Sequence, residues 1–179
     1  DITGENDGAI NNLLQTYLSI KNTNKNRISN YEEKVSTIKP CWYNNYNFDI
    51  VKENIKNTIL SIIGCNSKRV SGFKEIRYFN KMYLINAFIE LFPNTKVICH
   101  IDDNIDRQCK SDWWGKNINS KNHLINYNKQ LINYSIKNKK SYLFYMKYLF
   151  DINEVKKLFI FLNEDLDEET YDYIIKNKL

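Results

Sequence analysis

The fold of this chain is decided by the stretch from Gly72 to Trp114, which reads GFKEIRYFNKMYLINAFIELFPNTKVICHIDDNIDRQCKSDWW. Apolar residues recur at helical spacing between Met82 and Phe92, and the following Pro93-Asn94 pair predicts the end of that helix. The short apolar run from Val97 to Ile101 then lies between turn signals, which is typical of a buried strand in a parallel sheet. The stretch therefore predicts a strand end, a helix, a strand and a second helix, in that order.

The rest of the chain shows the same alternation of helical and strand patterns. Helical periodicity predicts helices from about Ala9 and at about residues 48–63, 120–137 and 155–162, with a short final helix near the C-terminus. The run from Ser141 to Tyr145 has the length and composition of a second buried strand. Because strands alternate with helices, the sequence predicts an α/β fold with a mainly parallel sheet flanked by helices.

The length and composition indicate how the chain is organised. A chain of 179 residues has the size of one domain, and we expect a single domain. Residues 21–39 are polar with only isolated apolar positions, which predicts a loop or lid over the sheet. A plain surface excursion explains that pattern equally well. Asn, Lys, Ile and Tyr are over-used even in the periodic segments, which we interpret as genome composition bias and not as disorder.

The net charge and the spacing of the cysteines limit the kinds of ligand and partner that we expect. The net charge of +5 is modest, and the basic residues are scattered among acids and asparagines. This pattern favours an anionic ligand only weakly, and we expect no nucleic-acid partner. The four cysteines have no CxxC spacing and no nearby pair of histidines, so we expect no metal site. No signal peptide or spanning helix of about twenty apolar residues is visible, which predicts a soluble, cytoplasmic protein without a membrane segment.

Ligands of open parallel sheets bind outside the carboxyl ends of the strands, which makes the residues after two predicted strands candidate site residues. Lys74 and Arg77 follow the first of these strands, where a cation can meet an anionic ligand. Arg107, Lys110 and Ser111 follow the second. Arg107 and Ser111 are four residues apart on one face of a predicted helix, a pairing suited to hold a phosphate. Solvated surface charge is the alternative for each of the basic residues.

Four other residues have side chains with usable chemistry. Glu5 lies in a Gly-Glu-Asn turn, where its carboxylate can act as a general base or help to start the following helix. Trp113 and Trp114 can form a stacking platform for an aromatic base or anchor the core. His100 lies within a predicted strand, and we interpret it as structural. Taken alone, these features predict an α/β domain that binds an anion.

Three segments, in this order and spacing, resemble the core of the sulfotransferase family. They are Gly72-Phe73-Lys74-Glu75-Ile76-Arg77-Tyr78, Leu91-Phe92-Pro93-Asn94-Thr95-Lys96-Val97-Ile98 and Lys110-Ser111-Asp112-Trp113-Trp114. They most resemble the bacterial and viral branch of the family and its tyrosylprotein and glycan sulfotransferases. The turn from Ile2 to Asn6 is similar to the Gly-Glu turn after the family's first helix, and residues 145–161 are similar to its late strand and helix. The similarity therefore covers nearly the whole chain.

The resemblance implies a three-layer, P-loop-like sulfotransferase fold and a group-transfer activity. Members of this family transfer a sulfuryl group from 3′-phosphoadenosine-5′-phosphosulfate to a hydroxyl or amine of a small molecule, glycan or protein, and they need no metal. By this resemblance Glu5 corresponds to the base, Lys74 to the cation near the acceptor and the sulfuryl group, and Ser111 to the serine that holds the 3′-phosphate. The basic residues expected to assist in binding this co-substrate are Arg107, Lys110 and Arg77.

The chain departs from the family pattern at two places. The phosphosulfate loop, a Gly- and Ser-rich turn that cradles the 5′-phosphosulfate, is expected just upstream of Asp1, outside these residues. Asp102 stands where the family usually has an arginine, and we expect its carboxylate to repel the 3′-phosphate. Arg107, one turn further along, is expected to take the place of the missing arginine. A sulfotransferase is our main hypothesis. The alternatives are a noncatalytic relative that binds a sulfated, nucleotide or protein partner, and an unrelated α/β binding protein.

Overall fold

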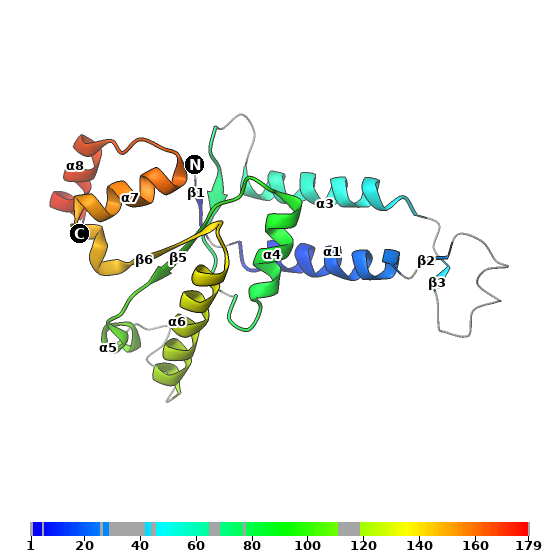
Figure 1. Cartoon of the computed structure of the whole chain (residues 1–179), viewed down its shortest axis with the longest axis horizontal. Coiled ribbons are helices and arrows are strands. Elements are labelled where there is room, and N and C mark those ends of the chain that lie inside the picture. Colours follow the sequence, from blue (N-terminus) through cyan, green and yellow to red (C-terminus); the bar gives the residue numbers. More distant parts are fainter. Residues whose placement is uncertain are drawn as a thin grey trace. The chain divides into compact units, whose positions relative to one another are not determined.

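The computed structural model divides the chain into two compact units, residues 1–94 and 95–179. The residues that the structure describes are 2–4, 6–25, 27–28, 42–43, 46–64, 69–76, 78–110 and 119–178. Helices predominate among them, and each of their strand pairs is parallel (Figure 1). The described part of the chain therefore has the α/β character that the sequence pattern predicted.

The first unit is built around three packed helices, α1 (Ala9–Lys25), α3 (Phe48–Ile63) and α4 (Met82–Leu91). Helix α1 contacts both α3 and α4, and each helix turns its apolar stripe toward the others. The buried side chains of this core are Ile10, Leu14 and Tyr17 of α1, Ile55, Ile59 and Ile63 of α3, and Leu84, Ile85, Ala87 and Leu91 of α4. Removal of their apolar surface from water is the main force that stabilises the unit.

Both ends of α3 follow from its local sequence. The side-chain oxygen of Asn47 accepts hydrogen bonds from the backbone N–H groups of Asp49 and Ile50, at 3.0 and 3.3 Å, and so caps the first turn. At the other end Gly64 has a φ of 71°, the left-handed conformation in which glycine ends many helices. The predicted helix over residues 48–63 is therefore confirmed.

Helix α1 extends further than the sequence pattern indicated. It continues to Lys25, so residues 21–25 of the segment predicted as a loop or lid are helical. Two contacts from distant segments support this extension: the Lys21 ammonium binds Glu90 of α4, and the Tyr46 hydroxyl donates to a backbone carbonyl of α1 at 2.9 Å. These tertiary contacts offset the weak helix propensity of the asparagine and threonine residues in the last turns.

The strands of the first unit are short. Strand β1 (Ile2–Thr3) pairs in parallel with β4 (Gly72–Phe73), so that Ile2 lies opposite Gly72. Strand β2 (Arg27–Ile28) pairs in parallel with β3 (Trp42–Tyr43). Apart from β2, the remainder of the predicted loop or lid lies outside the described residues.

The second unit contains the longest strands of the described residues, β5 (Val97–Ile101) and β6 (Ser141–Tyr145). They pair in parallel along their whole length, from Val97 opposite Ser141 to Ile101 opposite Tyr145. Helices α5 (Ile105–Cys109) and α6 (Ser120–Lys137) lie between them in the chain. A 3₁₀ helix, η1 (Met146–Phe150), and helices α7 (Ile152–Leu162) and α8 (Glu168–Lys178) follow. The bounds of β5, α6 and β6 agree with the sequence prediction.

Helices lie on both sides of the β5–β6 pair, although one face of β5 stays partly open. The Ser141 hydroxyl donates to a backbone carbonyl of α6, that of Ser135, at 3.3 Å. The ring of the next residue, Tyr142, packs against Phe161 of α7 with 5.2 Å between centroids. Because successive side chains of a strand point to opposite faces, α6 and α7 lie on opposite sides of the pair (Figure 1).

Strand β5 is half-buried, which corrects the prediction of a strand buried on both faces. Cys99 and Ile101 are buried, whereas Ile98 is 39% exposed and His100 is also exposed. The apolar run of the sequence does not reveal this difference, because Ile98 is apolar although it lies on the open face. His100 lies next to Phe144 of β6 with 6.1 Å between ring centroids, in agreement with its structural interpretation.

Two further properties concern the described residues alone. None of their helices has both the length and the apolar character needed to cross a membrane. They contain no cluster of three or more His, Cys, Asp or Glu side chains suited to a metal ion. Of the four cysteines, the structure describes Cys99 and Cys109, and both are free thiols.

Candidate functional site

The residues predicted to form a site are distributed over both units. Lys74 follows β4 directly in the first unit and is exposed. Arg107 lies on α5 and Lys110 at its C-terminal end, both exposed, in the second unit. The other three predicted site residues lie outside the described residues: Glu5, Arg77 and Ser111. Both tryptophans of the predicted stacking platform, Trp113 and Trp114, also lie outside them. Their expected meeting at one nucleotide site stays a prediction.

Asn6 supplies two hydrogen-bond acceptors to the first turn of α1. The Asn6 side-chain oxygen accepts from the backbone N–H of Ile10 at 3.2 Å, and its backbone oxygen accepts from that of Ala9 at 3.1 Å. Asn6 therefore contributes to the start of α1, whereas Glu5 lies outside the described residues and both of its predicted roles stay predictions.

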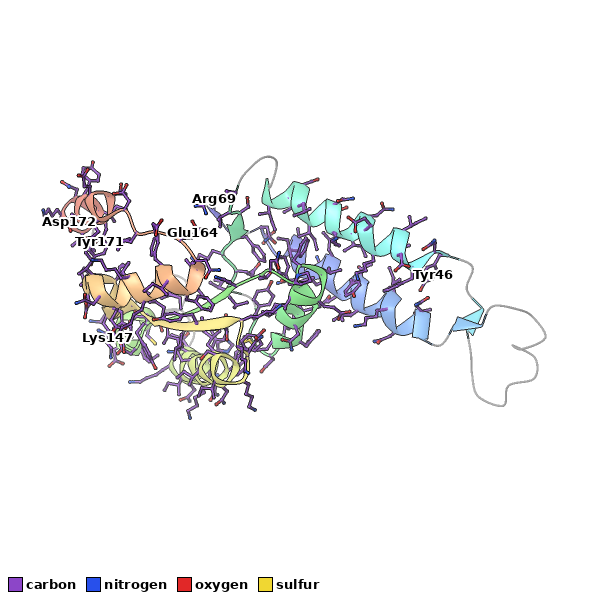
Figure 2. All side chains as sticks on the ribbon, turned by 45° about the horizontal axis from the view of Figure 1, so that its top comes forward. Tyr46, Arg69, Lys147, Glu164, Tyr171 and Asp172 are labelled. Carbon is purple, nitrogen blue, oxygen red and sulfur yellow. The ribbon has the colours of Figure 1, made fainter. Side chains whose placement is uncertain are left out.

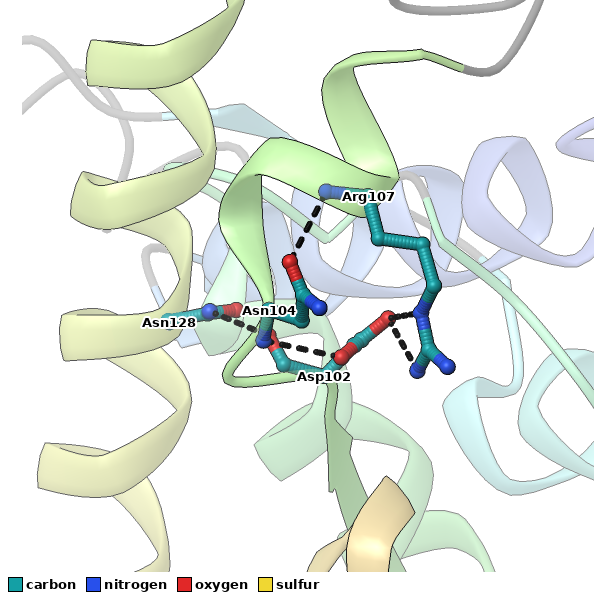
Figure 3. A network of polar contacts seen from close by, with 4 residues as sticks. All are labelled: Asp102, Asn104, Arg107 and Asn128. Atoms are coloured by element: carbon teal, nitrogen blue, oxygen red, sulfur yellow. Dashed lines mark hydrogen bonds and ion pairs between the residues drawn. The ribbon is translucent and has the colours of Figure 1, made fainter.

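The best-defined polar arrangement lies where β5 ends and the chain enters α5. The Asp102 carboxylate accepts from the backbone N–H of Asn104 at 2.9 Å, and the Asn104 side chain accepts from the backbone N–H of Arg107 at 2.9 Å (Figure 3). The Asn128 amide of α6 donates to the backbone oxygen of Asp102 at 3.2 Å. Side-chain acceptors that bond to the backbone two or three residues ahead give this turn one defined conformation.

Asp102 also binds the guanidinium of Arg107. The Arg107 Nε and Nη2 atoms donate to the same carboxylate oxygen, Oδ2, at 3.1 and 2.8 Å (Figure 3). The Asp102 side chain is only 15% exposed, whereas that of Arg107 is 56% exposed. Arg107 was expected to compensate for the acid at position 102, but the two side chains bind each other because the Asp102–Asn104–Arg107 turn brings them together. The cation is thereby partly neutralised, although three of its five N–H groups are not used by Asp102.

A second ion pair joins the segments that follow the two parallel strands. Lys147 of η1, which is labelled in Figure 2, donates to Asp103 Oδ2 at 2.8 Å. Both side chains are about half exposed. The hydrogen bond from Lys147 lowers the pKa of Asp103, and the nearby Arg107 charge lowers it further. The Lys147 ammonium also lies over the rings of Tyr145 and Tyr148, at 5.2 and 5.8 Å from their centroids.

Lys147 is a candidate site residue that the sequence prediction did not include. A signal for it was present, because Ser141 to Tyr145 was predicted as a parallel strand and Lys147 follows its carboxyl end. Four charges therefore meet at the carboxyl edge of the β5–β6 pair, and we call them the edge network: Asp102, Asp103, Arg107 and Lys147. Its two acids and two bases give it no net charge.

A polar cluster of the first unit has a structural role. The buried Tyr17 hydroxyl donates to Glu90 Oε1 at 2.7 Å, and Lys21 Nζ donates to Glu90 Oε2 at 2.6 Å. The hydrogen bond from Lys21 lowers the pKa of Glu90, while burial and the Glu90 hydrogen bond raise the pKa of Tyr17. The cluster ties α1 to α4 at the edge of a helical core, which explains its presence without any ligand.

Comparisons with known proteins add no relative to this description: no family model, no curated protein and no solved structure matches the chain.

Proposed function

We propose that this chain is a sulfotransferase-like protein, which transfers a sulfuryl group from 3′-phosphoadenosine-5′-phosphosulfate to a hydroxyl or amine. The proposal includes a three-layer, P-loop-like fold for the chain as a whole. The observation that carries it is the edge of the β5–β6 pair, where cations follow both of two neighbouring parallel strands. Carboxyl edges of parallel strands are the usual ligand sites of open sheets, and cations there suit an anionic co-substrate. The sequence resemblance supplies the chemical identity of that co-substrate.

In the proposed reaction the acceptor attacks the sulfur atom of the sulfuryl group. The acceptor loses its proton to the Glu5 carboxylate, a bond forms between the acceptor and sulfur, and the bond between sulfur and the bridging phosphate oxygen breaks. The electron pair of that bond leaves with adenosine 3′,5′-bisphosphate. Lys74 would stabilise the negative charge that develops on the transferring group and on the leaving phosphate. The acceptor is a small molecule, a glycan or a protein.

The 3′-phosphate would be held by Ser111 together with Arg107, Lys110 and Arg77. Phosphate contacts of this kind position the nucleotide, and accurate positioning of the reacting atoms lowers the barrier substantially. Arg107 would use the N–H groups that its contact with Asp102 leaves available. No metal enters this mechanism, because the charges that need neutralising are met by lysine and arginine side chains.

A second candidate function is a noncatalytic relative that keeps the fold and binds a sulfated, nucleotide or protein partner. The contact between Asp102 and Arg107 favours this candidate, because a carboxylate already neutralises part of the cation expected to hold the 3′-phosphate. Such a protein would bind the nucleotide or the partner without turning it over.

Two measurements on the intact protein test these functions. Isothermal titration calorimetry with adenosine 3′,5′-bisphosphate measures nucleotide binding, and Ser111→Ala should weaken that binding. Transfer of ³⁵S from labelled 3′-phosphoadenosine-5′-phosphosulfate to a tyrosine peptide, a glycan and a small alcohol measures activity. Binding with transfer supports the sulfotransferase, and binding without transfer to any acceptor supports the noncatalytic relative. Absence of both would overturn the sulfotransferase and the nucleotide-binding form of the noncatalytic relative.

A further inference from the structure

We propose that Arg107 and Lys147 form an anion-binding pair at the carboxyl edge of β5 and β6, and that Asp102 and Asp103 are internal counter-ions that the ligand displaces. The ligand is a phosphate- or sulfate-bearing anion. The proposal rests on the proposed function only for the choice of nucleotide. It adds Lys147 as a binding residue and gives the two aspartates a role in setting affinity.

The register of the strands brings the two cations to one place. Ile101 and Tyr145 are opposite each other at the ends of β5 and β6, so the chain leaves both strands at the same edge. Asp103 receives the Lys147 hydrogen bond at 2.8 Å, and Arg107 is near enough for its charge to act on the same carboxylate. The two cations therefore follow the same edge of the strand pair and contact the consecutive residues Asp102 and Asp103.

Exposure and hydrogen-bond capacity indicate that the cations remain accessible. The side chains of Arg107 and Lys147 are 56% and 58% exposed, and exposed ion pairs are weak in water. Arg107 uses two of its five N–H groups on Asp102, and the Lys147 ammonium has further donors beyond the one directed at Asp103. A phosphate group, with more charge and more acceptor oxygens than a carboxylate, can therefore replace either aspartate.

The residues around Lys147 can hold its ammonium group in position after a ligand has replaced Asp103. The rings of Tyr145 and Tyr148 lie beneath the ammonium group and attract it independently of Asp103. Asp102, in contrast, is held by the backbone N–H of Asn104 and is largely sheltered from solvent. It can therefore keep its place in the turn when the Arg107 guanidinium moves to a ligand.

The structure offers a matched control for the removal of each charge. Asp106 of α5 binds Lys121 of α6 at 2.8 Å, and this pair is more exposed than those of the edge network. Asp106→Asn changes the net charge of the protein by the same amount as Asp102→Asn or Asp103→Asn. It releases a lysine that follows neither strand of the pair. Comparison of these variants therefore separates the effect of freeing a binding cation from the effect of a change in net charge.

The first arm of the experiment measures tighter binding. Calorimetric titration of the intact protein with adenosine 3′,5′-bisphosphate, and separately with inorganic pyrophosphate, should give roughly three- to tenfold tighter binding for Asp102→Asn and for Asp103→Asn. Asp106→Asn should change either affinity by less than about twofold, because Asp106 pairs with Lys121 and its replacement frees neither Arg107 nor Lys147. Equal effects of all three variants would overturn the proposal, and so would no effect of the first two.

The second arm measures loss of binding. Lys147→Met and Arg107→Met should each weaken pyrophosphate binding by roughly tenfold, whereas Lys121→Met should not. Unchanged thermal unfolding by circular dichroism, or a partial restoration of binding by Lys147→Arg, excludes a folding defect as the cause. If the affinity for adenosine 3′,5′-bisphosphate is unchanged in the Lys147 and aspartate variants, this proposal is overturned and the proposed function is not. Pyrophosphate binding with the expected dependence, but without any binding of the bisphosphate, overturns the proposed function alone.

Discussion

Lys147 Nζ lies 2.8 Å from Asp103 Oδ2, and this contact joins the segments that leave two neighbouring parallel strands. With the contact between Asp102 and Arg107 it places four alternating charges at one edge of the second unit. An edge of this kind is neutral as a whole, but it contains two exposed cations that an anion can reach. The proposed functions depend on how readily these cations exchange their internal partners for a ligand.

Replacement of the proposed base should abolish most of the transfer activity. We expect Glu5→Ala to reduce sulfuryl transfer by about 10²-fold or more, because general-base catalysis typically contributes that factor. The measurement is the rate of ³⁵S transfer in the intact protein at saturating co-substrate. Glu53→Ala, which removes an exposed acid on α3, serves as the control and should leave the rate unchanged. An unaltered rate in Glu5→Ala would remove Glu5 from the mechanism.

The hydroxyl of Tyr17 should contribute measurably to stability. Tyr17→Phe removes the hydrogen bond to Glu90 from a side chain that is only 1% exposed, and we expect a loss of about 0.5–1.5 kcal/mol in the free energy of unfolding. Urea denaturation measures this loss. Tyr83→Phe on α4 removes a hydroxyl from a side chain that is 49% exposed, and it should have almost no effect. Equal losses in the two variants would contradict the structural role of Tyr17.

The ionised form of Glu90 should stabilise the first unit at neutral pH. Because the hydrogen bond from Lys21 lowers the pKa of Glu90 in the folded protein, its contribution is complete above the ordinary pKa of about 4.5. That contribution is lost as the pH falls through the lower, folded value. Glu90→Gln should therefore unfold at a lower temperature than the native protein at pH 7, and the difference should shrink in strongly acidic buffer. A difference that grows toward low pH would contradict this sign.

Gly64 at the end of α3 should be required because of its backbone conformation, and not because a larger side chain would lack space there. No atom lies within 4 Å of a β-carbon built on Gly64, but its φ of 71° is unfavourable for alanine. We expect Gly64→Ala to lower the free energy of unfolding by about 1–2 kcal/mol. Gly64→Asn should cost less, because asparagine adopts the left-handed conformation more readily. Urea denaturation of both variants would show this order, and a reversed order would contradict it.

The two described cysteines should differ in reactivity. Burial raises the pKa of the Cys99 thiol to about 11, so only about one thiol in a thousand is ionised at pH 8. Cys109 is more accessible and should be alkylated by iodoacetamide much sooner. Peptide mapping by mass spectrometry after short exposures separates the two sites. Labelling of Cys99 as rapid as that of Cys109 in the native protein would show that the strand opens readily.

The sequence by itself determined the elements whose signals are local. Periodic apolar residues and helix-ending residues predicted the helices over 48–63 and 120–137 and the strands over 97–101 and 141–145. The pattern of short apolar runs between helices also predicted parallel pairing. These signals act over a few residues, because helix and strand periods repeat within one element.

Only the tertiary structure decided which charges meet. Lys147 and Asp103 are 44 positions apart, and it is the register of Ile101 opposite Tyr145 that brings their segments together. No local pattern contains that register. The turn after β5 likewise directs Arg107 back to Asp102, although the sequence suggested a cation available to a phosphate. Partner choice among exposed charges depends on where the backbone places them, and that is a property of the folded chain.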